Sequence, residues 1–298
     1  SDFVLSEAQA SSLKSKIHIG DNISNATKPS VLVVDYKGAD LSAMFSGTED
    51  ANDKDKEVKV TYALDATRDF STIAPLVTNL SDADCIDLNG NTLTLKADQA
   101  QALKEFIVNS KSSSDATLKI VNYKGEDLTT VADGDKAGFK AGTGEGRITL
   151  ITEVAGNVDI SKSSKNPLLG LEDGPSTKLA DQIEVGGDDV LTLDVAQADE
   201  LQENIRGLKA TGGANDGKVI VKNYDGTDLS GIEAVAQSEL DVTFEVNNVQ
   251  NFTVKKDGGS AQTADDLYKL VSSADVIKVD DGDTSQDADA KLTLTAAQ

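Results

Sequence analysis

Five aspartates near the end of the chain are the residues whose type and spacing best suit chemistry. Carboxylate oxygens are the ligands that Ca²⁺ prefers, and several of them in one short loop can share a cation. The loop lacks the full spacing of an EF-hand and its final glutamate, so a solvated acidic turn is the alternative interpretation. The candidate calcium ligands are Asp280, Asp281, Asp283, Asp287 and Asp289.

Catalytic chemistry has few candidates in this sequence. His18 is the only histidine and Cys85 the only cysteine, which leaves no disulfide within the chain and no zinc site of several Cys or His ligands. Cys85 lies in an apolar stretch that is typical of a buried residue in a strand. The glycine-rich residues 142–146 lack the lysine of a phosphate-binding loop. We therefore expect that the chain is not an enzyme, and calcium is the one cofactor with any support.

The chain is strongly acidic and poor in aromatic residues. Its 298 residues include 28 Lys and Arg against 51 Asp and Glu, a net charge of −23. Binding to nucleic acid or to an anionic membrane surface needs clustered cations, so neither partner is expected. No run of 18 apolar residues occurs, so no membrane insertion is expected. Trp is absent, which removes the commonest anchor of ligand pockets and interfaces.

The elements that must position these residues recur along the chain. Gln9, Gln99, Gln197 and Gln298 each follow a leucine by four residues and are 90, 98 and 101 residues apart. A leucine four residues and an isoleucine eight residues after each of the first three lie on one helical face. The pattern predicts an amphipathic helix of about three turns in each copy. We expect the glutamine to cap this helix or to contact a strand.

A second block recurs in register with the first. Tyr36, Tyr123 and Tyr224 each follow an apolar run and precede a Gly-x-Asp sequence. The apolar run predicts a strand and the Gly-x-Asp a turn. We expect each tyrosine to pack its ring and expose its hydroxyl to water, and a repeated binding feature is the alternative.

Weaker signals complete each copy. They are a further strand at residues 58–64, 148–154 and 242–246, a short helix clearest at residues 264–271, and an Ala-Asp-x-Ile strand. The predicted order of elements in each module is therefore strand, helix, strand, strand, helix, strand. Polar turns such as Asn89-Gly90 predict hairpins between modules. The predicted fold class is α+β, a tandem repeat of about three small modules, ferredoxin-like, with helices on one face of a sheet. A sandwich-like fold is the alternative.

The repeat predicts the domain boundaries. Modules are expected at residues 1–90, 91–188 and 189–289, and residues 290–298 match the first strand of a fourth copy. A longer array from which the chain is a piece would explain that last strand. A strand that completes a neighbouring molecule would explain it equally.

The layout and composition resemble the repeat regions of large secreted bacterial surface proteins, namely adhesins exported by type I secretion and surface-layer proteins. The resemblance rests on tandem modules, acidity, abundant Asp, Gly, Thr and Ser, and the scarcity of Cys and Trp. It implies a secreted or cell-surface location, self-assembly with neighbouring copies or modules, contact with a cell-surface glycan or protein, and rigidification by calcium. We therefore expect a non-enzymatic structural or adhesive repeat protein. An array of carbohydrate- or protein-binding modules is the alternative, and a secreted hydrolase with paired carboxylates is the third.

Overall fold

The computed structural model describes part of the chain, and the account below concerns that part. The chain divides into two compact units, each described by itself: unit 1 comprises Ser1–Val121, Asp127–Ile151 and Gly170–Ala180, and unit 2 comprises Asn122–Glu126, Thr152–Leu169 and Asp181–Gln298. The described residues are 3–13, 30–41, 59–73, 85–103, 110–128, 146–163, 167–168, 182–208, 217–224, 227, 229, 231–232, 240–246 and 276–279.

The fold is a parallel β-solenoid of about five turns. Strands make up 48% of it and helices 15%, and the strand pairs with a defined register run parallel in both units. The predicted α+β module of ferredoxin-like type is therefore wrong, and parallel pairing equally contradicts an antiparallel sandwich. The reason is that apolar alternation reports which face of a strand is buried and is the same for parallel and antiparallel neighbours.

The first sheet of unit 1 shows how the core is built. Its strands, in spatial order, are β1 (Phe3–Ser6), β2 (Ser30–Val34), β3 (Lys59–Ala63) and β5 (Cys85–Asp87). Their register aligns four apolar side chains that are each at most 5% exposed, Leu5, Val33, Tyr62 and Ile86. Neighbouring turns thus stack apolar residues in a continuous row, which buries one face of every strand.

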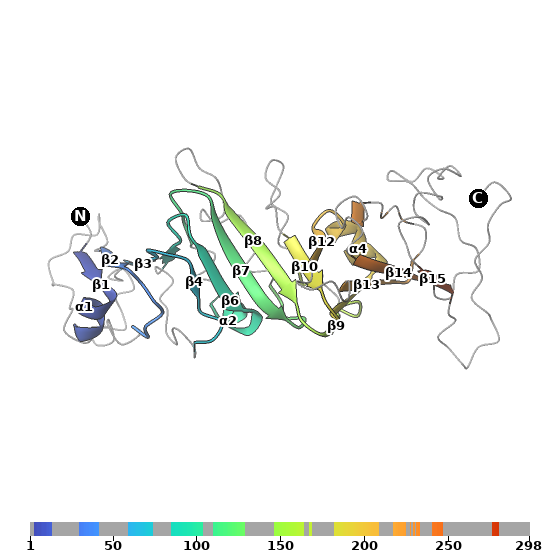
Figure 1. Cartoon of the computed structure of the whole chain (residues 1–298), viewed down its shortest axis with the longest axis horizontal. Helices are drawn as coiled ribbons and strands as arrows, with labels where there is room; N and C mark the ends of the chain where they lie inside the picture. Colours follow the sequence, from blue (N-terminus) through green and yellow to red (C-terminus); the bar gives the residue numbers. More distant parts are fainter. Residues whose placement is uncertain are drawn as a thin grey trace, which may run out of the picture. The chain divides into compact units, whose positions relative to one another are not determined.

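The second sheet of unit 1 begins with a strand of only two residues. In spatial order the strands are β4 (Arg68–Asp69), β6 (Thr92–Lys96), β7 (Ala116–Tyr123) and β8 (Ile148–Val154), of which β8 continues into unit 2 from Thr152 on. The parallel run of β4, β6 and β7 is visible in Figure 1. Alternate residues of β7 and β8 are buried, as expected for strands with one face toward a core.

Unit 2 contains a strand pair and a five-stranded sheet. The pair is β10 (Gln182–Gly186) with β12 (Ile205–Leu208). The sheet has the order β15 (Val276–Val279), β14 (Leu240–Val246), β13 (Gly217–Lys222), β11 (Val190–Asp194) and β9 (Asn157–Asp159). Leu193, Val221 and Phe244 align across three of its strands and are each at most 1% exposed. The core of unit 2 therefore repeats the stacking seen in unit 1.

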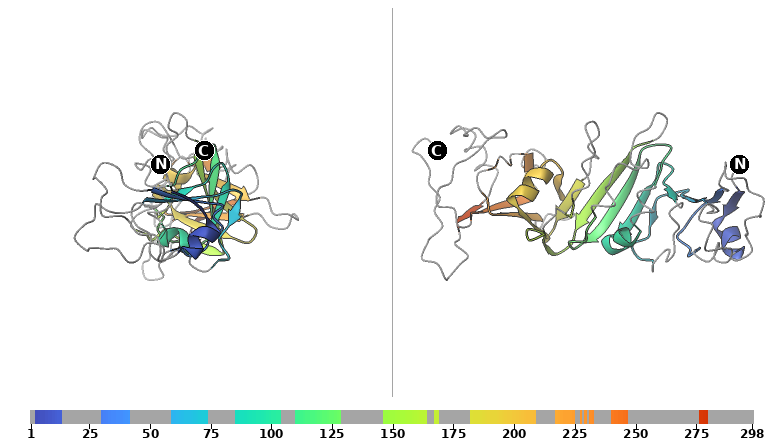
Figure 2. Two further views of the ribbon diagram at one scale, coloured as in Figure 1. Left: turned by 90° about the vertical axis from the view of Figure 1, so that its left-hand side faces the viewer. Right: turned by 180° about the vertical axis from the view of Figure 1, so that it is seen from behind.

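The helices are shorter than the sequence pattern predicts. α1 (Glu7–Ser12), α2 (Ala97–Ala102) and α4 (Val195–Leu201) each directly follow the first strand of a copy and have six or seven residues. Two further views of these strand-to-helix connections are given in Figure 2. The predicted three turns are wrong, because Ile205 lies in β12 and pairs with Ile183 instead of continuing the helix. Strand pairing overrides the helical spacing at this position.

A left-handed residue ends the second strand of each copy. Asp35, Asn122 and Asn223 have φ of 55°, 57° and 56° and directly precede the repeated tyrosines. Asp and Asn are the side chains that best tolerate this conformation. The backbone turn sends the next side chain into the core, where Tyr36, Tyr123 and Tyr224 are at most 1% exposed.

The tyrosine hydroxyls are buried, contrary to the prediction that they are exposed to water. The Tyr36 hydroxyl donates to the main-chain oxygen of Ala39 over 3.0 Å, and burial, with Glu7 and Asp40 adding to it, raises the pKa of Tyr36. The ring of Tyr36 contacts Tyr62 and Phe70 at centroid distances of 4.8 and 5.8 Å. The predicted packing of the ring is confirmed, and the repeated tyrosine is a core residue.

The turn after β5 does not form a hairpin. Asn89 and Gly90 both have positive φ, 48° and 77°, as a two-residue hairpin turn requires. Yet β5 and β6, the strands on either side, belong to different sheets. The predicted hairpin is wrong because β6 pairs in parallel with β4 and β7, which lie elsewhere in the sequence.

Candidate functional site

The predicted calcium ligands cannot be placed. Asp280, Asp281, Asp283, Asp287 and Asp289 lie outside the described residues, as do His18 and the fourth-copy residues 290–298. Among the residues that the structure describes, no group of three or more His, Cys, Asp or Glu is placed to hold a metal ion. Calcium binding therefore stays a prediction. Cys85 is 2% exposed in β5, and its sulfur lies 3.3 Å from the Thr61 hydroxyl, as suits a packing residue.

The structure brings together the segments on either side of each junction between sequence repeats. In unit 1, β4 of the first repeat pairs with β6 of the second, and Asp87 at the end of β5 forms a bridge with Lys111. In unit 2, β9 of the second repeat pairs with β11 of the third, and β10 pairs with β12. We call each of these two sets of pairs an interlock.

The segments of an interlock alternate along the chain. In unit 2 the first segment, β9, pairs with the third, β11, whereas the second, β10, pairs with the fourth, β12. The later repeat therefore receives a strand from the earlier repeat and returns one to it. Two repeats connected in this way separate only when main-chain hydrogen bonds of both sets break, and buried main-chain groups are costly to leave without partners.

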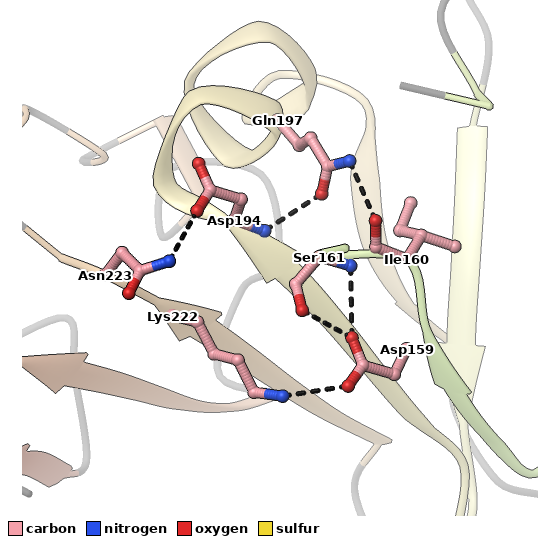
Figure 3. A network of polar contacts seen from close by, with 7 residues as sticks. All are labelled: Asp159, Ile160, Ser161, Asp194, Gln197, Lys222 and Asn223. Carbon is pink, nitrogen blue, oxygen red and sulfur yellow. Dashed lines mark hydrogen bonds and ion pairs between the residues drawn. The ribbon is translucent and has the colours of Figure 1, made fainter. Parts of the chain in front are cut away.

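The repeated glutamine stabilises each interlock through hydrogen bonds of both its amide oxygen and its amide nitrogen. The Oε1 atom of Gln197 accepts a hydrogen bond from the Asp194 main-chain nitrogen at 2.9 Å, which caps α4. The Nε2 atom donates to the Ile160 main-chain oxygen, also at 2.9 Å. Figure 3 shows this side chain between helix α4 and the segment that follows β9. The predicted roles of capping and strand contact are both confirmed here.

Gln99 makes the same contacts in unit 1. Its Oε1 accepts from the Lys96 main-chain nitrogen at 2.8 Å, and its Nε2 donates to the main-chain oxygens of Phe70 at 3.0 Å and Ile73 at 2.8 Å. Phe70 follows β4 directly, as Ile160 follows β9. One side chain thus holds the donated strand at each junction.

The donated strand ends in an Asp-x-Ser turn that the sequence analysis did not single out. The Asp69 carboxylate accepts from the Ser71 nitrogen at 2.9 Å and from its hydroxyl at 2.6 Å. The Asp159 carboxylate accepts from the same two groups of Ser161 at 3.0 and 2.5 Å. Such a local bond ends the strand and turns the chain toward the glutamine. The missed signal was a third recurrent block, Asp-Phe-Ser at residues 69–71 and Asp-Ile-Ser at residues 159–161.

An ion pair adds to the interlock of unit 2. Lys222 Nζ lies 2.8 Å from Asp159 Oδ2, and Asn223 donates to the Asp194 carboxylate at 2.8 Å (Figure 3). Burial raises the pKa of Asp159, but the hydrogen bonds from Lys222 and Ser161 outweigh it, so the pKa lies below its ordinary value of 3.8. The carboxylate therefore stays charged in mildly acidic solution.

Replacing Asp159 by asparagine is expected to lower the free energy of unfolding by about 0.5 kcal/mol at neutral pH, the scale of a partly exposed ion pair. A carboxylate with a depressed folded pKa stabilises the fold above its unfolded pKa and loses that contribution as the pH falls through the folded pKa. The deficit of the variant should be constant above about pH 5 and shrink below about pH 4. Urea unfolding across this range measures it. Lys222→Gln should reproduce the effect, and a deficit that persists at low pH would contradict it.

The interlock consists of main-chain pairing, amide hydrogen bonds and an ion pair, and this chemistry holds chain segments in place. No described helix is long and apolar enough to span a membrane. Comparison with models of protein families, with curated proteins and with solved structures found no match for this chain. The argument about function therefore rests on the geometry of the interlock and on the sequence.

Proposed function

We propose that this chain is a non-enzymatic structural or adhesive repeat protein of the cell surface, whose repeats interlock into a continuous array. The observation that carries the proposal is the alternating pairing of segments at both repeat junctions, by two strand pairs in unit 2 and by a strand pair and an isolated bridge in unit 1. Independent binding modules are joined by linkers alone and fold separately. Such modules do not require strand pairing between neighbours. In an array of stacked repeats, each junction adds an interface contribution to the stability of the repeats themselves.

The glutamines support this proposal because their contacts serve the junction. Gln197 is 6% exposed, and both polar ends of its side chain are used by the capping and donor hydrogen bonds. No substrate group is required to explain its burial. The repeated tyrosines are likewise buried, and their packing in the core explains their recurrence.

The acidic composition fits the same role. A net charge of −23 keeps a long array soluble and keeps chains apart until salt or divalent cations screen the repulsion. In this proposal the partners are neighbouring repeats and copies of the protein together with a glycan or protein of the cell surface, and calcium at the loop of Asp280 to Asp289 would add screening.

Stretching single molecules by their two ends tests whether the interlocks bear load. We expect a distinct rupture event in the parent chain and a lower rupture force when Gln99→Glu and Gln197→Glu are combined. Glutamate keeps the oxygen that caps the helix but removes the donor to Phe70 or Ile160. Gln9→Glu is the matched control, because the described contacts of Gln9 are confined to the cap of its own helix.

The proposal would be contradicted in two ways. One is a parent chain that extends without any rupture event. The other is a double variant whose rupture force equals that of the parent chain, since the interlock would then bear no load.

A further inference from the structure

The turn between β5 and β6 contains the one Asn-Gly sequence of the chain, Asn89-Gly90. Both residues are exposed to solvent. An asparagine followed by glycine is the dipeptide most prone to spontaneous deamidation, because glycine has no side chain to hinder ring closure. The reaction needs no enzyme, and water is the only other reactant. The chemistry available to this turn is therefore a covalent change of its main chain.

Deamidation at this pair consists of a ring closure and a hydrolysis. The Gly90 main-chain nitrogen attacks the side-chain carbonyl carbon of Asn89 and forms a cyclic succinimide, and the proton of that nitrogen leaves with the amide group as ammonia. Water then opens either carbonyl of the ring, which yields aspartate or isoaspartate. In isoaspartate the main chain runs through the former side chain and is one carbon longer. Ring closure thus requires a Gly90 nitrogen that can lose its proton and an Asn89 amide that can turn toward it.

The interlock of unit 1 occupies the Gly90 nitrogen. This nitrogen donates to Ser112 Oγ over 2.8 Å. Ser112 is 2% exposed, and its hydroxyl donates in turn to the main-chain oxygen of Ser114 at 2.6 Å. Ser112 directly follows Lys111, whose bridge with Asp87 is one part of the interlock. The proton that the reaction has to remove is therefore held by a buried acceptor of the second repeat.

The Asn89 side chain is held at both of its polar atoms. Its Nδ2 donates to the main-chain oxygen of Leu64 at 3.4 Å, and its Oδ1 accepts from the Ser113 hydroxyl at 3.2 Å. Its main-chain nitrogen donates to the Asp87 carboxylate at 3.0 Å. Leu64 belongs to the first repeat and Ser113 to the second, so these contacts join both sides of the junction. Because ring closure requires the side-chain contacts to break, the closed junction disfavours the reaction.

The corresponding turn at the junction of unit 2 lacks the reactive pair. A main-chain hydrogen bond between residues three apart closes both turns, at 2.8 Å in unit 1 and from Asp189 to Gly186 at 3.1 Å in unit 2. Gly187 takes the place of Asn89, and both residues have positive φ, 60° and 48°. Glycine has no side chain that could cyclise. The turn therefore does not need an asparagine at this position, and the two junctions differ in their covalent chemistry.

We propose that Asn89-Gly90 is a modification site controlled by the interlock of unit 1: the closed junction prevents deamidation, and each opening of the junction exposes the pair to it. The rate in the folded chain then equals the rate in an unfolded chain multiplied by the fraction of molecules whose junction is open. The inference rests on the geometry of the interlock and holds whether or not the chain forms an array at the cell surface.

Modification hinders the junction from closing again. Either product replaces the Asn89 amide by a carboxylate, so the Leu64 oxygen loses its donor. The new negative charge lies close to the Asp87 carboxylate, which accepts from the Asn89 nitrogen. Isoaspartate also lengthens the turn, which displaces the Gly90 nitrogen from Ser112. An opened junction is thus marked covalently and stays weakened.

Peptide mapping of the full chain by mass spectrometry tests this control. Deamidation at Asn89 is followed over time in mildly alkaline buffer, for the folded chain and for the same chain unfolded in guanidinium chloride. We expect the folded chain to react at least about tenfold more slowly, because opening the junction costs free energy.

Two glutamate variants separate opening of this junction from unfolding of the whole chain. Gln99→Glu removes the donor to Phe70 and Ile73 and should raise the rate in the folded chain at least about threefold. Gln197→Glu weakens the junction of unit 2 and should leave the rate at Asn89 unchanged. Circular dichroism checks that each variant is folded. Ser112→Ala removes the acceptor of the Gly90 nitrogen and should raise the rate as well, which keeps the test valid if Gln99→Glu does not fold.

Three results overturn the proposal. One is an equal rate in the folded and the unfolded parent chain, and the second is a rate that neither Gln99→Glu nor Ser112→Ala raises. The third is an equal acceleration by Gln99→Glu and Gln197→Glu, which would show that unfolding of the whole chain exposes the pair. Asn89→Gly, which places the residue of the second junction in this turn, is the matched control and should show no deamidation at this position.

Discussion

Replacing Tyr224 by alanine should lower the free energy of unfolding by about 3–5 kcal/mol, the cost of emptying a large aromatic site in a core. Tyr224 is 1% exposed and stacks on Phe244 with ring centroids 4.4 Å apart and an angle of 18° between the planes. Alanine leaves a cavity and removes the stacking contact. Urea unfolding of the full chain, followed by circular dichroism, measures the loss.

Tyr224→Phe is the matched control for this prediction. It keeps the ring and its stacking on Phe244 and removes the hydroxyl alone, so we expect a change within about 1 kcal/mol. If Tyr224 belonged to a binding surface, truncation to alanine would leave stability nearly unchanged and would reduce affinity for a ligand. A loss below about 1 kcal/mol in Tyr224→Ala would therefore contradict a core role.

Replacing Gln197 by glutamate should lower the free energy of unfolding by about 2–4 kcal/mol at neutral pH. The carboxylate places a charge in a buried site, and the Ile160 main-chain oxygen loses its hydrogen-bond donor. One carboxylate oxygen can still accept from the Asp194 nitrogen, but the other faces the Ile160 oxygen, where the amide nitrogen donated at 2.9 Å. The protonated acid can donate to that oxygen. Burial raises the folded pKa of this glutamate, so the loss should shrink as the pH falls through that raised pKa and should be smallest below about 4.3, the unfolded pKa of glutamate.

Gln9→Glu separates the capping role from the junction role. Gln9 makes the same cap, accepting from the Ser6 nitrogen at 2.9 Å, and its side chain is exposed. Glutamate at this position completes a capping box with Ser6, so we expect a change within about 0.5 kcal/mol. Equal losses in Gln9→Glu and Gln197→Glu would show that the cap alone matters and that the interlock contact contributes nothing.

The strands could be predicted from sequence because their signal is local. The apolar runs before the repeated tyrosines predict strands at residues 31–34, 118–121 and 219–221, and each lies within an observed strand. The capping role of the glutamine is local as well, since it joins residues three apart. The short helices were overestimated because Ile205, whose spacing fits the helix, is taken by pairing with β10.

The donated strands could not be predicted for a physical reason. β4 has two residues and β9 has three, which is too short for a period of two to stand out in the sequence. Their glutamine partners lie 29 residues along the chain in unit 1 and 37 in unit 2. The Asn89-Gly90 turn has hairpin dihedrals and still joins two different sheets. The residue types of a turn specify its backbone dihedral angles but do not specify which strands pair with the two strands that it joins.

The sequence by itself determined the repeat, because its blocks recur in register 90 to 101 residues apart, and the helix caps, because each cap joins residues three positions apart. Only the tertiary structure decided that the strands pair in parallel and that neighbouring repeats exchange them. The cause is that strand pairing satisfies the hydrogen-bonding groups of the main chain, which are the same in nearly every residue. The pattern of side chains therefore does not specify which strand is the pairing partner. The interlock is therefore a property of the folded chain, although its glutamines are visible in the sequence.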